Sequence, residues 1–300
     1  MSDIREIHPE DSAYPSLLKQ THRPPATLYV RGTLPSNDLP SVAIVGSRKC
    51  SEYGITAARK ISRELGAVGV TIISGMARGI DSAAAYGALE AGAHTVAVLG
   101  CGTDICYPSE NKPLMDQILE TGCIISEFEP GTAPQRHHFP MRNRIISGMS
   151  HALVVVEAGE HSGTESTVSH ALEQGREVCA VPGSIFNRMS EGTNELLKSG
   201  ATLVTSGEDV LRALRCQLRQ TPLPDRRPSD IVKISSKVDE SALAPEEKMI
   251  YAYISFEPVA VDEVIRQTRL SAQVVLYTLT KLELQQLIRR VPGQKYMRNI

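Results

Sequence analysis

The stretch VAIVGSRKCSEYG, residues 42–54, decides the fold of this 300-residue chain. Its first four residues are apolar and mostly β-branched, and Gly46 follows them, which is typical of a buried strand that turns into a helix in a nucleotide-binding fold. A dinucleotide-binding fingerprint would place its second glycine at position 48, but this chain has Arg48. The stretch therefore predicts a strand and an anion-binding turn in which the anion meets a guanidinium group.

Similar apolar runs recur along the chain on the C-terminal side of this stretch. They are VTII at 70, TVAVL at 95, CIIS at 123, ALVVVE at 152, EVCAVPG at 177 and TLVTS at 202. Continuous apolarity is typical of strands that are covered on both faces, as in a parallel sheet. Because Ala-rich helical stretches such as IDSAAAYGALEAG lie between the runs, we predict an α/β fold with a doubly wound, Rossmann-like, mostly parallel sheet.

The chain is expected to contain two domains. Residues 1–40 are read as a lead-in segment, residues 41–219 as the Rossmann-like core, and the Pro-, Ser- and charge-rich residues 220–244 as a linker. Residues 245–300 read as three helices and two short strands around a Pro-Gly turn, which predicts a winged helix. The basic side chains of its wing are Arg289, Arg290, Lys295 and Arg298. This module could contact phosphates, dock a protein or support a dimer, and the sequence leaves the choice open.

Composition excludes several classes of protein. The formal net charge of −2 excludes binding of a polyanion through the field of the whole molecule, so such a partner would need a local basic patch. The six cysteines form no CxxC pair, and we predict neither a disulfide framework nor a metal site. Neither an N-terminal apolar signal nor a long apolar run is present, so we expect a cytoplasmic protein without a membrane segment. No cofactor is predicted, because the chain has no P-loop pattern, HExxH pattern or nucleophile elbow.

The loops that follow the predicted strands are rich in glycine and in cations. In an open parallel sheet these loops share one edge, where helix N-termini favour negative charge. The cations expected at this rim are Arg48, Arg78, Lys112, Arg142 and Arg144, and the aromatic residues that could stack on bases are Tyr53, Tyr107 and Phe139. Structural alternatives remain open for several of these residues. Asp81 could cap its helix or pair with Arg78, the two later arginines could pair with Glu157, and each aromatic ring could be core packing.

The motifs GSR, SGMARGIDSAAAYGAL, GCGTDICYPSENKPL, FPMRNRIISG and SGTESTVSHALEQGREVCAVPG, followed by GTNELLKSGA, together resemble the DNA-processing protein A family, also called DprA or Smf. The resemblance implies a homodimer that binds single-stranded DNA, protects incoming strands during natural transformation and loads the RecA recombinase onto them. It also implies that Arg48 and Lys112 contact the strand, and that Gly46 and Ser47 offer main-chain or hydroxyl contacts. We add Arg142 and Arg144 to these candidate DNA contacts on the basis of their charge and placement alone.

A similar architecture occurs in phosphoribohydrolases that cleave nucleoside monophosphates and carry the signature PGGxGTxxE. Aligning SGTEST on that signature puts Thr167 where the catalytic glutamate should be, and on a helix Glu165 points away from that position. Since a hydroxyl cannot replace a carboxylate as a general base, we predict a binding protein and no enzyme. The alternatives are such a hydrolase, or a nucleotide-sensing module of the same fold.

Overall fold

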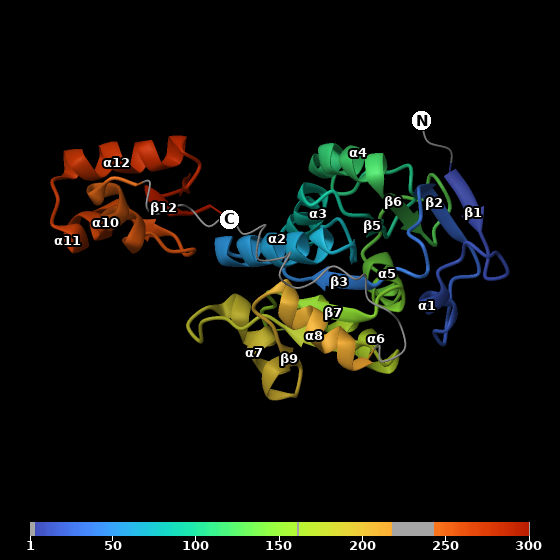
Figure 1. Cartoon of the computed structure of the whole chain (residues 1–300). Helices are drawn as coiled ribbons and strands as arrows, with labels where there is room; N and C mark the ends of the chain where they lie inside the picture. The colour runs from blue at the N-terminus through green and yellow to red at the C-terminus, as the bar shows by residue number, and fades with distance from the viewer. Residues whose placement is uncertain (1–3, 161, 218–242, 300) are drawn as a thin grey trace. The chain divides into compact units, whose positions relative to one another are not determined.

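The computed structural model describes residues 4–160, 162–217 and 243–299, which fall into two units with their boundary at residue 231 (Figure 1). The predicted linker, residues 220–244, lies outside the described residues except for Leu243 and Ala244. Each unit has its own core of buried apolar side chains.

The first unit is built on a nine-stranded sheet with the order β1-β2-β6-β5-β4-β3-β7-β8-β9. The strands are β1 (Ile4–Ile7), β2 (Leu28–Gly32), β3 (Ser41–Val45), β4 (Thr71–Ser74), β5 (Thr95–Val98), β6 (Cys123–Ser126), β7 (Ala152–Val155), β8 (Glu177–Ala180) and β9 (Thr202–Leu203). The strands from β3 to β9 pair in parallel, whereas β1 pairs with β2 and β2 with β6 in antiparallel fashion. The predicted mostly parallel sheet is confirmed, and every predicted apolar run forms one of its strands.

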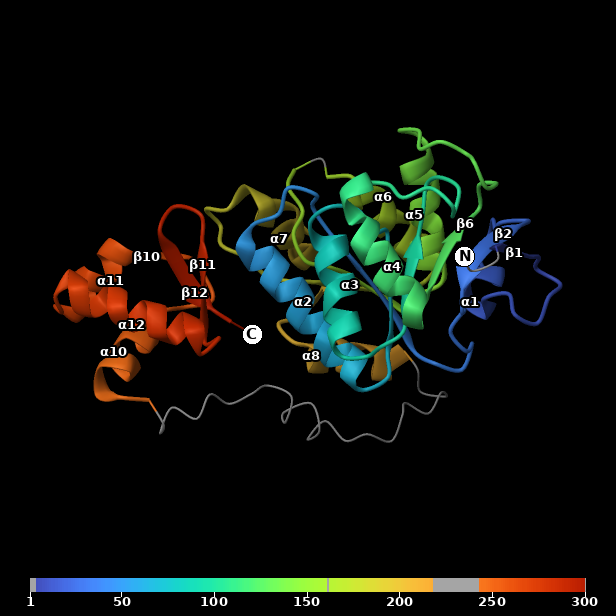
Figure 2. The same ribbon diagram turned by 90° about the horizontal axis from the view of Figure 1, so that it is seen from above.

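Helices cover both faces of this sheet. They are α1 (Ser16–Lys19), α2 (Glu52–Ala67), α3 (Ile80–Glu90), α4 (Lys112–Thr121), α5 (His138–Gly148), α6 (Thr164–Glu173), α7 (Glu191–Lys198) and α8 (Gly207–Gln217), with the 3₁₀ turns η1 (Ser109–Asn111) and η2 (Arg188–Ser190). Val42 and Ile44 pack against α2, α3 and α8, whereas Ala43 and Val45 face α1, α5 and α6. Figure 2 shows α2, α3 and α4 side by side on one face. Burial on both faces explains why the strands are continuously apolar.

The winding of the sheet reverses between β3 and β7. From β3 the chain continues through β4, β5 and β6 on one side, and it then returns to lay β7, β8 and β9 on the other side. The loops that leave the carboxyl ends of β3 and β7 therefore diverge. A crevice outside the sheet opens at such a point, and ligands of doubly wound folds bind there.

The second unit is a winged helix. Its elements are α10 (Pro245–Tyr253), β10 (Val259–Ala260), α11 (Val261–Thr268), α12 (Ala272–Leu284), β11 (Ile288–Val291) and β12 (Lys295–Arg298). The three predicted helices and the two wing strands are confirmed, and the short strand β10 joins the wing as an edge partner of β12. Within the described ranges, no helix has the length and apolar character needed to cross a membrane.

Candidate nucleic-acid interface

The crevice at the switch point is a cleft of about 700 Å³. Its walls come from the loop after β3, the loop between β4 and α3, the first turns of α5 and α6, and the loop after β7; they include Gly46, Ser47, Arg48, Lys49, Ala77, Tyr107, Arg136, Phe139, Gly163 and Thr164. We call it the Arg48 cleft. Of the cations that the sequence predicted at one edge, Arg48 and Arg142 line this hollow, whereas Arg78, Lys112 and Arg144 do not.

Arg48 lies over the aromatic side chains of this cleft. Its guanidinium carbon is 5.0 Å from the centre of the Phe139 ring, and the Phe139 and Tyr107 ring centres are 5.4 Å apart. Arg48 is exposed, forms no ion pair with any described residue, and Tyr107 is 40% exposed. A cation held on a ring face with its donors open to solvent can bind an anion, and an exposed ring beside it can stack on a base.

The loop that carries Arg48 is held by the buried residue Glu157, which follows β7. The Ser47 amide donates to the Glu157 main-chain oxygen (2.7 Å), while the Ser51 amide and hydroxyl donate to the Glu157 carboxylate (2.7 and 2.6 Å). Ser51 in turn caps α2 by accepting from the Gly54 amide (3.2 Å). The Glu157 carboxylate therefore already occupies the anion-binding position at the N-terminus of α2.

Glycines let two loops cross under Arg48. A Cβ atom on Gly79 would lie 2.4 Å from the Ser47 oxygen, and one on Gly46 would lie 2.6 Å from the Ile80 side chain. Gly79 also has φ of 76°, which side chains rarely adopt. Gly46 and Ser47 thus position the loop, and the Ser47 hydroxyl, which accepts from the Lys49 amide (3.1 Å), braces it further.

Arg78 and Lys112 are both exposed, and each is engaged in a surface ion pair. Arg78 pairs with Glu110 and Lys112 with Asp116. Asn111 fixes this region to the loop after β4 by donating to the Met76 oxygen (2.8 Å) and the Ser82 hydroxyl (2.9 Å). Because exposed pairs contribute only about 0–1 kcal/mol, both cations can exchange a carboxylate for a phosphate.

The prediction that Arg142 contacts an anion at the rim is wrong. Its side chain is 4% exposed and forms part of the floor of the Arg48 cleft, where Nη1 donates to the main-chain oxygens of Gly75 (2.9 Å) and Val98. Burial lowers the pKa of Arg142 to about 10, and the nearby Asp81 carboxylate opposes that shift. Arg142 therefore braces β4 against β5 from inside.

Arg144 was predicted at the same rim, and it lies elsewhere. It is two residues beyond Arg142 on α5, so its side chain leaves the helix about 200° away. It pairs with Glu127 (2.5 Å) and lines a different cleft. The alternative that these arginines pair with Glu157 is also wrong, since the Glu157 carboxylate accepts from Ser51 and Asn187.

Tyr53 and Asp81 have structural roles. The Tyr53 hydroxyl donates to the Pro182 oxygen (2.7 Å), and its ring packs on the core beneath α2, so it is not placed to stack on a base. Asp81 accepts from the Ala77 amide (3.4 Å) in the loop before α3, but the N-cap of that helix is Gly79 and no side chain caps it, while Arg78 pairs with Glu110, so neither predicted alternative for Asp81 is seen. Desolvation raises the pKa of Asp81, and Arg142 and Arg48 act against this shift.

Lys49 and Arg136 are cleft cations that the sequence reasoning missed. Both are exposed, both line the Arg48 cleft, and neither forms an ion pair within the described part of the chain. Lys49 could have been found from its place next to Arg48. Arg136 lies in the segment between β6 and α5, whose course no periodic pattern predicts.

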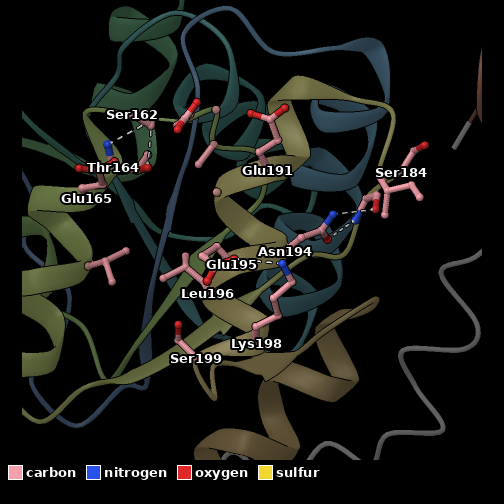
Figure 3. Close-up of a pocket in the computed structure, with 17 residues that line it drawn as sticks. Ser162, Thr164, Glu165, Ser184, Glu191, Asn194, Glu195, Leu196, Lys198 and Ser199 are labelled. Atoms are coloured by element: carbon pink, nitrogen blue, oxygen red, sulfur yellow. Dashed lines mark hydrogen bonds and ion pairs between the residues drawn. The ribbon is translucent and has the colours of Figure 1, made fainter.

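The neighbouring cleft, shown in Figure 3, is acidic. It measures about 920 Å³ and shares Glu160 and the Ser162–Thr164 turn with the Arg48 cleft. Its exposed carboxylates are Glu160, Glu165, Glu191 and Glu195, and its lysine, Lys198, pairs with Glu195 (3.1 Å). A polyanion in the Arg48 cleft would be repelled on this side, so it must extend toward Arg136 and Phe139.

The position that would carry the glutamate of a phosphoribohydrolase does not hold a carboxylate. Thr167 lies on α6 with 2% of its surface exposed, and Glu165 points out on the other side into the acidic cleft. Within the described residues, no cluster of histidine, cysteine, aspartate and glutamate side chains could hold a metal ion.

An open cationic cleft at the switch point of a Rossmann-like sheet, joined in one chain to a winged helix, is the architecture of a polyanion-binding protein. Residues 5–215 match the family model described as DNA recombination-mediator protein A, and residues 235–294 match the DprA winged helix domain. The chain belongs to the DNA recombination-mediator protein A family, DprA.

Individual relatives agree with this assignment. The chain is 44% identical to the DNA processing protein DprA of Streptococcus pneumoniae over 67% of this chain and 71% of that protein. It is 40% identical to the protein Smf of Escherichia coli over 95% of this chain and 75% of that protein. The X-ray structure of the Streptococcus pneumoniae protein superposes with a TM-score of 0.65 at 41% identity, covering 70% of this chain and 74% of that one. A DprA structure from Helicobacter pylori, described for its single-stranded DNA binding mode, gives a TM-score of 0.63 at 27% identity over 72% of this chain and 99% of that one.

Proposed function

We propose that this chain binds single-stranded DNA in the Arg48 cleft and presents the strand for recombination without cutting any bond. The observation that carries the proposal is Arg48 itself, an exposed guanidinium group without an ion-pair partner in the described residues, stacked on Phe139 at the switch point. A single strand is flexible enough to lay its phosphates on such a group while its bases reach the rings. The single-stranded DNA binding described for the Helicobacter pylori relative supports this assignment.

The cleft residues have distinct roles in this proposal. Arg48, Lys49 and Arg136 neutralise phosphates, and Phe139 and Tyr107 stack on bases at about 1–3 kcal/mol per base. Lys112 and Arg78, which do not line the cleft, add phosphate contacts outside it once the strand displaces Asp116 and Glu110. Gly46 and Ser47 hold the loop in place.

Charge reversal at Arg48 tests the assignment. Arg48→Glu should lower the affinity for labelled oligo-dT by at least about 100-fold, because it removes one phosphate contact and adds a repelling charge in the cleft. Fluorescence anisotropy measures this change, and thermal unfolding checks that the fold is intact. Lys19→Glu is the matched control, since Lys19 is exposed, does not line the Arg48 cleft and forms no ion pair with a described residue. Equal affinities of wild type and Arg48→Glu would refute the proposal.

The finer proposals concern what happens to the bound strand. We infer that the protein acts as a homodimer in the cytoplasm, protects incoming DNA during natural transformation and loads the RecA recombinase. The family's role in recombination supports this sequence of events. Loading is measured as the rate at which RecA starts to hydrolyse ATP on strands coated with single-strand-binding protein. Wild type should shorten the lag and Arg48→Glu should not.

A further inference from the structure

The segment of residues 20–26 lies at the same edge of the sheet as Arg48, although it precedes the parallel strands in sequence. It leads into β2, which runs antiparallel to β6, and Tyr29 near the start of β2 pairs with Ser126 at the end of β6. The beginning of β2 is therefore at the carboxyl edge of the parallel strands. Figure 1 shows β2 beside β6. Topology thus adds residues of the lead-in segment to the rim.

This segment, α5 and α6 enclose a cleft of about 920 Å³, which we call the Arg23 cleft. Its arginines are Arg23, Arg144 and Arg176, its histidines are His22 and His170, and its carboxylates are those of Glu127 and Glu173. Each carboxylate has a partner: Arg144 lies 2.5 Å from Glu127, and His170 lies 3.5 Å from Glu173. Arg23 is exposed and forms no ion pair in the described ranges, so the cleft keeps an uncompensated positive charge.

Residues that line the Arg23 cleft also carry buried polar atoms without a hydrogen-bond partner. Four buried atoms make no hydrogen bond to another described residue, namely Arg144 Nη1, Arg176 Nε, Gln174 Oε1 and Glu127 Oε1. Native proteins leave few buried polar atoms unpaired, so a polar ligand that enters the cleft and displaces the side chains over these atoms gains hydrogen-bond partners there. A nucleotide offers both kinds of partner, through its phosphate and its base edge.

The two basic clefts are neighbours. Pro140, in the first turn of α5, lines both of them, and Arg136 and Phe139 of the Arg48 cleft lie just before it in sequence. The acidic cleft borders the Arg48 cleft through Glu160 and the Ser162–Thr164 turn. A strand that leaves the Arg48 cleft therefore meets carboxylates in one direction and the Arg23 cleft in the other.

We propose that the Arg23 cleft is a second subsite of the DNA interface, which takes the nucleotides that continue past Pro140. Arg23 contacts a phosphate of this continuation, and the wall of Arg144, Gln174 and Arg176 receives a nucleotide. This inference rests on the proposed function, because it needs a strand in the Arg48 cleft.

Strand length separates the two subsites experimentally. An oligo-dT of about six nucleotides should fill the Arg48 cleft alone, whereas one of about twenty should reach both clefts. Arg23→Ala should leave the affinity for the short strand unchanged. It should weaken the long strand about 5- to 10-fold and reduce the salt dependence of the long strand by about 0.7 in log–log slope. Lys19→Ala is the control, because it removes a nearby exposed cation that lines neither cleft.

Each other outcome is informative. Wild-type affinity of Arg23→Ala for both lengths, or an equal loss for both, would overturn the second subsite while leaving the Arg48 assignment intact. If neither Arg48→Glu nor Arg23→Ala lowered the affinity for the strand, the proposed function itself would be refuted. Amide exchange of the wild-type protein gives an independent readout. Residues 20–27 should gain protection with the long strand and not with the short one, and equal protection with both would contradict the proposal.

Discussion

Glu157 explains how this fold presents an arginine where related folds hold a phosphate. Its carboxylate is fully buried and accepts three hydrogen bonds, two from Ser51 and one from Asn187 (3.3 Å). A Cβ atom on Gly54 would lie 2.3 Å from Glu157 Oε2, so the first turn of α2 needs a glycine to admit the carboxylate. The internal anion satisfies the helix N-terminus and fixes the loop, which leaves Arg48 free to point outward.

Removing this charge should loosen the loop. We expect Glu157→Gln to destabilise the protein by about 1–2 kcal/mol, since charge-assisted hydrogen bonds at a helix N-terminus become neutral ones. It should also weaken oligo-dT binding several-fold, although Glu157 itself contacts no strand. In Glu157→Ala, added inorganic phosphate should raise the melting temperature more than in wild type, because an external anion can take the vacated position. Equal phosphate effects in the two proteins would argue against an anion position at α2.

The arginines of α5 show that the sequence does not predict which of two neighbouring side chains is buried. The RNR spacing shows two cations close in sequence, but helical geometry sends Arg142 into the sheet and Arg144 toward the lead-in segment. Which of them is buried depends on carbonyl oxygens of Gly75 and Val98, which belong to distant strands. The stacking of Arg48 on Phe139 likewise depends on tertiary structure, although both residues could be predicted at the rim.

At the scale of elements, the third helix of the winged-helix unit, α12, presents an outer face with few cations. The outer face of α12 presents Tyr277 (71% exposed) and Leu284 (80% exposed). Its lysine, Lys281, pairs with the buried Glu247 of α10 (2.6 Å). In the wing, Arg298 is also engaged, because it donates to the oxygens of Ile254 and Tyr251 and stacks on the Tyr251 ring. Arg298 is therefore not a free surface cation, which reduces the cluster of four wing cations predicted from sequence.

This distribution predicts a minor role for the wing in strand binding. Replacing Arg290 and Lys295 by alanine should change the affinity for oligo-dT by less than about twofold, as expected for exposed charges that make no specific contact. Arg48→Glu, measured in parallel, provides the scale of a direct contact. A drop in the double variant comparable to that of Arg48→Glu would show that the winged helix is a principal reader.

Strands could be predicted from the sequence where both of their faces are buried. The strands from β3 to β8 carry continuous apolar runs because helices cover both faces, and this pattern identified all of them, together with the more exposed edge strand β9. β1 was missed, since Ile4–Ile7 reads IREI, with two adjacent charged residues between two isoleucines, and lies at the edge of the sheet. The lead-in strand β2 could be anticipated, but its antiparallel pairing with β6 could not, and that pairing is what brings Arg23 to the rim.

For the whole molecule, charge placement matters more than net charge. The chain carries a formal net charge of −2, so its overall field does not attract DNA. The basic clefts and the acidic cleft lie along one edge of the sheet, and in the proposed function this separation of charge orients the bound strand. Duplex DNA should therefore compete poorly with oligo-dT, because its paired bases cannot reach Phe139 and Tyr107.

Salt dependence measures how many of these cations act together. Arg48, Lys49 and Arg136 are exposed and have no ion-pair partner in the described residues, so their three phosphate contacts predict a log–log salt slope of about −2 on a strand short enough to fill only the Arg48 cleft. Arg136→Ala should make this slope shallower by about 0.7.

Lys112→Ala should change it less, because Lys112 first has to leave Asp116. Conversely, Asp116→Asn should tighten binding by freeing that lysine. Anisotropy titrations across a salt series test all three variants, and an unchanged slope for Arg136→Ala would place the strand outside the Arg48 cleft.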